Sequence, residues 1–538
     1  MRMHWSDVIG ERLVSQHDGL HVVNTGITPS GEFHIGHLRE ILTGEMIVRG
    51  LRRQGGDARF CFVVDSADPL RKVYDFLDET YEAYVGVQLY RIPPPDVDGR
   101  PDMAAYANGR SYADHFLGPF LDALKILGVD PELVYNHTEY LTGRYVKHIR
   151  TAIREKARVR EIIERVSGRE LPEDWWPFTP VDERGCQSGL KVSHVEGDLV
   201  HWVADDGRTG VCDITKGEGK LPWRLDWPAK WCNLGVTCEP FGKDHGAAGG
   251  SYETGKELCV LLGGTPPEGL TYEWISLRGE GAMSSSAGNT VGPIEALRLV
   301  PPEILRYLIA STKPNKAIEF DTGMGLVTLA DAYERLLRHD LEGKLKDPEL
   351  SRRQLVAIED DLVSTRLSSV EDTDHRPSAV GVTFRHLAML VQIRQDDEDV
   401  WAMMPHDVGE RAEFDARIRR MRHWVTSNHF PEEMRIAVRE APDMERLQSL
   451  SDEDIPLHEA LVKRLSNALE SGEWNEATLS GCVPQASRDV EQSLRNAYRL
   501  TYELLLGVDV APKLAPLLAA MDPARVMWLM TGRDQQAS

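Results

Sequence analysis

The sequence has few cysteines and no hydrophobic run long enough to cross a membrane. Its seven cysteines are scattered and odd in number, which argues against a disulfide framework and predicts reduced thiols. No apolar stretch approaches the roughly 20 residues that a membrane-spanning helix needs. The first residues, MRMHWSDVIGERL, lack the apolar core of a signal peptide. We therefore expect a cytoplasmic protein that does not associate with a membrane.

Basic charge is also scarce. The chain of 538 residues has 62 lysines and arginines against 85 aspartates and glutamates, a net charge of −23. Nucleic-acid binding depends on clustered Lys and Arg, so this balance argues against a general nucleic-acid binder and leaves room for a local basic face. The densest basic cluster is Arg417, Arg419, Arg420 and Arg422, followed by Trp424. Taken alone, this cluster is best explained as the solvated edge of a helix.

Paired metal-binding spacings are missing as well. Cys186 and Cys212 have no cysteine two residues away, and Cys232 and Cys238 are too far apart in sequence for a zinc knuckle. A structural zinc site needs such paired spacings. We therefore expect no zinc and no other resident metal.

The most informative stretch is residues 20–56. It has a short apolar run, a turn containing Gly26, and then apolar residues at helical spacing. A strand, a glycine turn and a helix start bring unpaired N–H groups and the positive end of a helix dipole to one point, where a phosphate binds well. His34 and His37 stand at this helix entrance, and Gly36 between them lets a ligand approach the backbone. The alternative is an ordinary strand–turn–helix with two surface histidines.

Strands and helices alternate through the first part of the chain. We expect strands at 58–65 and 133–135 and helices at 111–128 and 142–167. This alternation predicts an α/β fold with a doubly wound parallel sheet. Two stretches interrupt it. They are a long excursion at about 80–110 and a β-rich inserted module at about 170–221.

Three further motifs follow in order. Residues 221–231 hold three tryptophans, which suit either a core cluster or a pocket wall that grips an aliphatic or cationic chain. Next, a GKDH turn at 242–245 follows a strand expected at 234–237 and precedes a helix at 250–261. Its aspartate could hold a ribose or simply cap the helix. Finally, an expected strand at 269–277 leads to a serine-rich loop, which could wrap a polyphosphate or serve as a linker.

From Pro301 onward the pattern is helical. We place the boundary near residue 313, which predicts an α/β domain at 1–312 and an all-helical domain at 313–538.

The ordered set of motifs resembles the class I aminoacyl-tRNA synthetases, and within them the class I lysyl-tRNA synthetases. The phrases that carry the resemblance are TGITPSGEFHIGHLRE, LPWRLDWPAKW, EPFGKDHGAAGGSYETGKEL, GAMSSSAGN and RYLIASTKPNKAIEFD. The resemblance is dense from about residue 20 to 335 and looser through the helical half. It implies a Rossmann-like catalytic domain and a helical anticodon-binding domain, in which Trp424 and its neighbouring arginines would read the anticodon.

The resemblance also implies an activity and partners. The enzyme would activate L-lysine with ATP and Mg²⁺ and transfer it to tRNA(Lys). Separately from the resemblance, we expect a monomer. The implied catalytic residues are His34, His37, Ser284, Ser285 and Ser286. The implied ATP-binding residues are Ser30, Gly36, Gly242, Asp244 and Met283. The implied lysine-binding residues are Gly26, Thr28, Trp223, His245 and Tyr272.

One position departs from the family pattern. Ala287 stands where many members carry a lysine after the serines. Losing one preorganised donor at the pyrophosphate costs roughly 100- to 1,000-fold in rate unless another group replaces it, and we name Arg278, Lys216 or Lys220 as replacements. The departure leaves two alternatives open. One is a paralogue that delivers lysine or an analogue to an acceptor other than tRNA, and the other is a non-catalytic lysine- or tRNA-binding protein.

Overall fold

The computed structural model forms two compact units. It describes residues 4–278, 281–282, 291–373, 375–404, 411–509 and 513–533. The first unit comprises Met1–Leu297, Pro302–Phe320 and Asp340–Pro377, and the second comprises Arg298–Pro301, Asp321–His339 and Ser378–Ser538. The chain thus passes between the units several times, because residues 340–377 pack with the first unit. The single boundary near residue 313 stays a prediction about functional domains.

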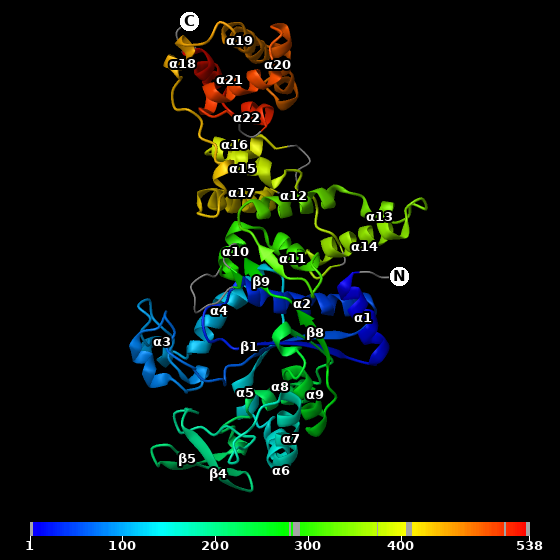
Figure 1. Ribbon diagram of the computed structural model, residues 1–538, viewed down its shortest axis with the longest axis vertical. Coiled ribbons are helices and arrows are strands. Elements are labelled where there is room, and N and C mark those ends of the chain that lie inside the picture. The colour runs from blue at the N-terminus through cyan, green and yellow to red at the C-terminus, as the bar shows by residue number, and fades with distance from the viewer. Residues whose placement is uncertain are drawn as a thin grey trace. The chain divides into compact units, whose positions relative to one another are not determined.

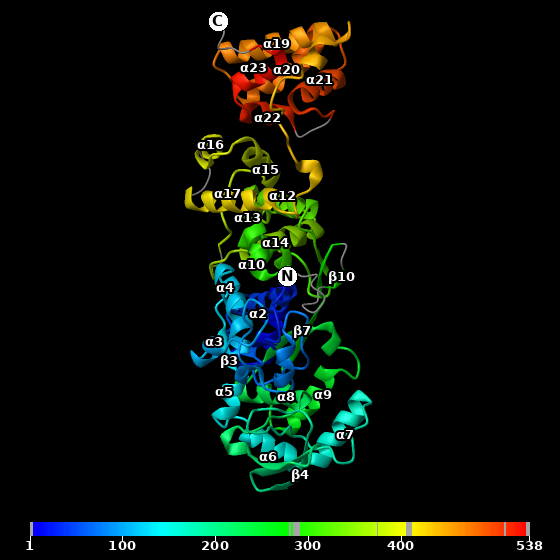
Figure 2. The ribbon, with the colours of Figure 1, turned by 90° about the vertical axis from the view of Figure 1, so that its left-hand side faces the viewer.

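A five-stranded parallel sheet organises the first unit. Its strands are β1 (His21–Ile27), β2 (Ala58–Val64), β3 (Glu132–Tyr135), β7 (Cys238–Gly242) and β8 (Glu268–Tyr272). Their order is β3-β2-β1-β7-β8, so the chain builds outward from β1 first on one side and then on the other. Helix α2 lies on one side of this sheet and helices α8 and α9 lie on the other (Figures 1 and 2). The predicted doubly wound, Rossmann-like α/β fold is confirmed. In such folds a ligand crevice lies where the strand order reverses, here between β1 and β7.

Helix α2 (Ile35–Arg53) is buried along most of its length. It packs against β1, β2 and β7, and also against α1 (Trp5–Gln16). The two helices approach closely because both carry glycine at the contact. A Cβ added to Gly50 would lie 2.4 Å from the carbonyl oxygen of Ser6, and one added to Gly10 would lie 2.7 Å from Gly50. The C-terminal end of α2 is therefore packed closely against α1.

Some other helices of this unit are short or broken. The predicted helix at 142–167 is two helices, α6 (Val146–Arg154) and α7 (Lys156–Ser167), because Glu155 between them leaves helical geometry at φ −95° and ψ 22°. The excursion near 80–110 contains only short helical turns. The remaining elements are η1 (Glu79–Tyr84), η2 (Leu89–Arg91), α3 (Met103–Ala107), α4 (Tyr112–Ile126), α5 (Asn136–Leu141), α8 (Trp223–Leu234), η4 (Lys243–His245), α9 (Ser251–Leu261), α10 (Pro293–Leu299), α11 (Pro302–Ala310), α13 (Leu341–Lys344) and α14 (Arg352–Leu367).

The predicted β-rich module is an antiparallel sheet of β4 (Leu190–Glu196), β5 (Leu199–Ala204) and β6 (Thr209–Asp213), followed by η3 (Ile214–Lys216). Its inward side chains Val200, Trp202 and Cys212 share one core with residues of α6 and α7. Figures 1 and 2 both place β4 at the same end of the unit as these helices. The module is thus packed onto the helices that flank it.

Two predicted strands differ from the structure. Residues 234–237 are not a strand, because α8 runs to Leu234 and Gly235 ends it in the left-handed region at φ 65°. Residues 269–277 are two strands, β8 and β9 (Ile275–Leu277). β9 lies in a separate sheet with β10 (Gly281–Ala282) and β11 (Ile318–Phe320). The helical prediction for residues 313 onward therefore misses one strand, β11, whose Ile318 and Phe320 are buried while Glu319 is exposed.

The second unit is helical throughout its described residues. Its elements are α12 (Met324–Arg338), α15 (Phe384–Ile393), α16 (Asp397–Ala402), α17 (Arg411–Thr426), η5 (Glu432–Met434), α18 (Met444–Gln448), α19 (Asp454–Glu470), α20 (Glu476–Asp489), α21 (Leu494–Leu506), α22 (Leu514–Ala520) and α23 (Pro523–Thr531). Trp424 is 0% exposed, and its indole N–H donates to the carbonyl of Thr322 at 2.8 Å. Its assignment to anticodon binding is therefore wrong, since a nucleobase cannot reach a core side chain. Within the described parts of the chain, no helix is both long and apolar enough to cross a membrane.

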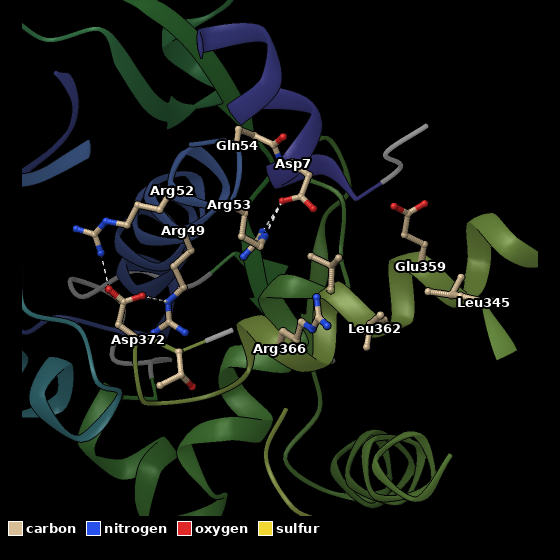
Figure 3. Close-up of a pocket in the computed structure, with 12 residues that line it drawn as sticks. Asp7, Arg49, Arg52, Arg53, Gln54, Leu345, Glu359, Leu362, Arg366 and Asp372 are labelled. Carbon is tan, nitrogen blue, oxygen red and sulfur yellow. Dashed lines mark hydrogen bonds and ion pairs between the residues drawn. The ribbon is translucent and has the colours of Figure 1, made fainter. Parts of the chain in front are cut away.

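A cavity of about 660 Å³ lies at the C-terminal end of α2 (Figure 3). Arg49 and Arg52 both contact Asp372, and Arg53 pairs with Asp7 at 2.5 Å. These guanidinium groups are thus engaged by carboxylates of the same cavity. We interpret the cluster as the contact that holds residues 369–373 against α2.

Candidate active site

The turn between β1 and α2 places two histidines on the first turn of α2. The backbone N–H of Gly36 donates to His34 Nδ1 at 3.1 Å, and that of His34 donates to His37 Nδ1 at 3.1 Å. The two imidazole rings lie 4.1 Å apart. The sequence predicted unpaired N–H groups here, and the histidines satisfy two of them. Because His34 Nδ1 is an acceptor, its proton is on Nε2, which is available as a donor.

Both histidines are uncharged at neutral pH. Burial lowers the pKa of His34 to about 4. Burial, with the neighbouring His34 as a smaller cause, lowers the pKa of His37 to about 3. The pair can therefore present neutral N–H donors to a developing negative charge, beside the positive end of the helix dipole.

The serine-rich loop, with Met283, Ser284, Ser285, Ser286 and Ala287, lies outside the described residues. Its flanks are described. Before it, β10 pairs with β9. After it, the carbonyl of Val291 accepts a hydrogen bond from the N–H of Ile35 at 3.0 Å. The chain thus leaves this segment against the first turn of α2.

A small cavity of about 80 Å³ lies next to this turn. Its lining residues come from β1, α2, the end of β2, α8, and β7 with the turn after it. The lining residues are Asn24, Gly26, Glu40, Asp65, Trp223, Trp227, Lys230, Glu239, Pro240, Phe241 and His245. We call it the amino-acid cavity. Its aromatic wall is formed by Trp223 and Trp227, whose rings both lie 5.5 Å from the ring of His245.

Glu40 projects from α2 into this cavity with only neutral donors around it. Its carboxylate accepts from the N–H of Gly26 at 2.9 Å and from the hydroxyl of Tyr272 at 2.7 Å. Burial raises the pKa of Glu40 to about 7, and these two hydrogen bonds only partly oppose the shift. A carboxyl group in this state gains free energy from any cation that enters the cavity.

Glu239 is the second such carboxyl. It accepts from the indole N–H groups of Trp227 and Trp231, both at 2.6 Å, and from the side-chain amide of Asn24 at 3.1 Å. Burial raises its pKa to about 7 as well. The three donors hold the carboxyl group rigidly. The cavity therefore has two carboxyl groups that neutral groups orient, which is the chemistry of a cation-binding site.

The other charges near the cavity are paired. Lys230 contacts Asp65 and lies 3.0 Å from Asp226. Burial alone would lower the pKa of Lys230, but Asp226 and Asp65 outweigh burial and raise it. Lys220 is likewise buried and paired with Asp68. Lys220 is therefore not free to supply the positive charge that is missing at Ala287. The prediction that Lys220 replaces the loop lysine is wrong.

The GKDH turn lies on the other side of the crevice, directly after β7. Gly242 is the last residue of β7, and a Cβ there would come within 2.8 Å of the ring of Trp274. Asp244 is exposed, and its carboxylate forms no hydrogen bond with the described residues. An exposed carboxylate at the C-terminal end of a strand beside the switch point is suited to the hydroxyl pair of a ribose. The backbone carbonyl of Ser30, in the turn between β1 and α2, accepts a hydrogen bond from the hydroxyl of Tyr112 at 2.8 Å, and the assignment of Ser30 to ATP binding stays a prediction.

The structure brings most of the predicted residues together around one crevice. Gly26, Trp223 and His245 line the amino-acid cavity, and Tyr272 touches it through Glu40. Thr28 is not among the residues that line this cavity. Its hydroxyl donates to Asp68 at 3.0 Å.

Sequence reasoning missed the charged lining residues Glu40, Glu239 and Lys230. Each lies inside a phrase that the motifs already contain. The signal available in the sequence was a charged residue with apolar residues before and after it.

A histidine turn at the switch point, a carboxylate after the next strand, and a cation cavity between them define an α/β enzyme that handles a nucleotide and a small cationic substrate. Comparison with known proteins makes this more specific. The family model for class I (K) tRNA synthetases matches residues 3–358.

Curated relatives extend the similarity to nearly the whole chain. The lysine–tRNA ligase of Thermoplasma acidophilum is 35% identical over 522 residues, which cover 96% of each chain. That of Archaeoglobus fulgidus is 34% identical over 527 residues, 96% of this chain and 97% of its own. That of Methanosarcina barkeri is 44% identical over 356 residues, 65% of this chain and 64% of its own. This chain belongs to the class I (K) tRNA synthetase family.

Proposed function

We propose that this protein activates L-lysine with ATP and transfers it to tRNA(Lys). The names of its curated relatives support this function. The observation that carries it is the pair of carboxyl groups, Glu40 and Glu239, which face one aromatic-walled cavity beside the histidine turn. Each has its pKa raised to about 7 by burial.

The amino-acid cavity matches lysine in the kinds of groups that line it. Lysine has two ammonium groups joined by an aliphatic chain, and the cavity offers two carboxyl groups and tryptophan faces. Trp223 and Trp227 can pack on the methylene groups while the carboxyl groups take the charged ends. A neutral or acidic amino acid has only its α-ammonium group, so one of the two carboxyl groups would stay without a cation, and an unpaired buried charge is costly.

The first step joins the lysine carboxylate to ATP. A carboxylate oxygen forms a bond to the α-phosphorus, and the bond from that phosphorus to the pyrophosphate oxygen breaks. Negative charge then grows on the phosphate oxygens. His34 and His37 donate N–H groups to it, and Gly36 lets the phosphate approach the start of α2. Asp244 and Gly242 hold the ribose. In the second step the 3′-terminal adenosine hydroxyl of tRNA attacks the lysyl carbonyl, and AMP leaves.

Mg²⁺ acts with ATP in this proposal. The described residues contain no group of three histidine, cysteine, aspartate or glutamate side chains that could hold a metal. Mg²⁺ in ATP-dependent enzymes is commonly coordinated mainly by phosphate oxygens and water, and it does not need such a group of protein ligands. When bound, it neutralises charge on the leaving pyrophosphate. We propose no zinc site. That the protein is a monomer and that it is located in the cytoplasm both stay predictions.

Ala287 supports a second candidate function. An enzyme without the loop lysine could still form lysyl-adenylate and pass it to an acceptor other than tRNA. The experiment that separates the two candidates is lysine-dependent ATP–pyrophosphate exchange, followed by charging of tRNA(Lys). Exchange with charging supports the first candidate, and exchange without charging supports the second. Lysine binding without exchange would contradict both.

A further inference from the structure

A second cavity, of about 500 Å³, lies in the first unit and is lined largely by aromatic rings. The mechanism above does not use it. Four lining side chains are rings, and the others are small or polar. The lining residues are Tyr90, Tyr106, Gly109, Ser111, Asp114, Tyr135, His137 and Thr138. We call it the aromatic cavity.

The aromatic cavity adjoins the amino-acid cavity. His137 Nδ1 lies 2.6 Å from the hydroxyl of Ser66, and Ser66 directly follows Asp65, which lines the amino-acid cavity. On the neighbouring strand end, Asn136 precedes His137 and donates to Asp65 at 3.3 Å. Two pairs of consecutive residues thus connect the cavities, and consecutive Cα atoms are only about 3.8 Å apart. A ligand in the aromatic cavity would therefore be next to lysine bound in the amino-acid cavity.

The rings of the aromatic cavity suit a planar heterocycle. Tyr90 and His137 are nearly parallel, with ring centroids 4.2 Å apart and an interplanar angle of 8°. Tyr135 meets His137 edge-on at 5.8 Å. Burial lowers the pKa of His137 despite the nearby Asp114 carboxylate, so its imidazole is an uncharged stacking surface at neutral pH. Unstacked nucleobases bind on such surfaces with little dependence on sequence.

Asp114 adds a selective polar group. Its Oδ2 atom accepts from the N–H and the hydroxyl of Ser111 at 3.0 and 2.7 Å, within the cap of α4. Its Oδ1 atom accepts no hydrogen bond from the described residues. A carboxylate oxygen at this place accepts from an exocyclic amino group, which cytosine has and uracil lacks.

Cationic groups stand at the edge of the same cavity. Arg91 donates to the hydroxyl of Tyr90 at 2.8 Å, and its guanidinium lies over that ring at 5.2 Å. Arg110 is exposed and lies between the lining residues Gly109 and Ser111. Both can contact the phosphates that join successive nucleotides.

We propose that the aromatic cavity binds a cytosine of the unpaired 3′ end of tRNA while the terminal adenosine reaches the lysyl group. This inference rests on the proposed function. It assigns recognition of an amino-bearing pyrimidine to Asp114 and stacking to the ring of His137. Its basis is the placement of an aromatic cavity with an unused acceptor directly beside the amino-acid cavity.

The test pairs protein variants with tRNA(Lys) transcripts whose two 3′-terminal cytidines are replaced by uridine, one at a time. With the wild-type protein, one replacement should raise the KM for tRNA about 5- to 100-fold, the range for one base contact. Asp114→Ala should abolish that difference between cytidine and uridine. Ser111→Ala removes hydrogen bonds of the same helix cap but keeps the carboxylate, so it should retain the difference. Equal discrimination in both variants would overturn the role of Asp114.

A second pair of variants tests stacking. His137→Ala should raise the KM for tRNA about 5- to 100-fold, whereas His137→Phe, which keeps a ring, should restore most of the affinity. Lysine-dependent ATP–pyrophosphate exchange without tRNA should change little in either variant. Equal charging by wild type and both variants would overturn the stacking role. A parallel loss of exchange in His137→Ala and His137→Phe would instead show a structural role and also count against the proposal.

Direct binding separates this inference from the proposed function. A short single-stranded RNA ending in CCA, labelled at its 5′ end, should bind the wild-type protein more tightly than its uridine-substituted counterparts in fluorescence anisotropy. That preference should be lost in Asp114→Ala and kept in Ser111→Ala. A wild-type protein that fails to charge tRNA but shows this binding pattern would contradict the proposed function and support the cavity. Charging by a wild-type protein without any preference between these RNAs would contradict the cavity alone.

Discussion

Glu40→Gln should weaken lysine binding and at the same time stabilise the protein without ligand. The substitution keeps the size and shape of the side chain but removes the negative charge. Charge-assisted hydrogen bonds contribute about 1.5–3 kcal/mol, so the KM for lysine in ATP–pyrophosphate exchange should rise about 10- to 150-fold. The KM for ATP should stay within about threefold, because Glu40 lines the amino-acid cavity rather than the nucleotide side.

Although Glu40→Gln should weaken lysine binding, it should increase the free energy of unfolding. Burial raises the pKa of Glu40 from 4.5 to about 7 in the folded protein. The folded state therefore binds this proton more tightly than the unfolded state. The resulting contribution to stability is fully present below the unfolded pKa and is lost as the pH rises through 7. Above that pH the ionised group costs about 3 kcal/mol, so Glu40→Gln should raise the unfolding midpoint at pH 8 and have little effect at pH 4.5.

Lysine affinity should depend on pH for the same reason. Below pH 7 a proton occupies the carboxyl group of Glu40, and lysine binding must displace it. The KM of the wild-type protein should therefore rise as the pH falls from 8 to 6, and Glu40→Gln should show a weaker dependence. Tyr272→Phe is the matched control. It keeps the carboxyl group but removes a hydrogen bond that lowers its pKa, so the pH dependence should move upward. A Glu40→Gln variant with unchanged KM and unchanged pH dependence would refute this reasoning.

Four further predictions concern other residues. His34→Ala should slow adenylate formation about 100- to 1,000-fold without loss of helical circular dichroism; a change below threefold would contradict its assignment. Asp244→Ala should raise the KM for ATP about 10- to 100-fold and leave the KM for lysine nearly unchanged, and the opposite pattern would place it at the amino acid. Lys230→Met should destabilise the protein by about 3–5 kcal/mol in denaturant unfolding, because it leaves buried carboxylates without their partner; wild-type stability would mean that these groups are protonated. Ala287→Lys should raise the exchange rate by up to about 100-fold, and an unchanged rate would mean that another group already supplies the charge.

Local patterns in the sequence predicted the first three strands of the parallel sheet well. Buried apolar runs and helical spacing located β1, α2 and β2 closely, because these elements are core along most of their length. Local patterns failed where packing partners decide the structure. Residues 234–237 look like a strand, yet α8 continues through Leu234 until Gly235 ends it. Trp424 was assigned to the anticodon on the family resemblance, and only the fold shows that its side chain is buried.

The candidate site shows the same division. Glycine and histidine motifs indicated a nucleotide site, since their chemistry is local to one turn. The carboxyl groups of Glu40 and Glu239 could not be identified in this way. Their role arises because α2 and β7, which are far apart in sequence, direct them into one cavity. A raised pKa is a property of that shared burial and is not visible in either segment alone.

The most direct test of the proposed function is ATP–pyrophosphate exchange with each of the standard amino acids, followed by charging of tRNA(Lys). Exchange that depends on lysine, falls strongly in His34→Ala and is followed by charging is the predicted result. Exchange with a neutral or acidic amino acid in place of lysine would contradict the cation cavity, and the absence of exchange with every amino acid would contradict the proposed reaction.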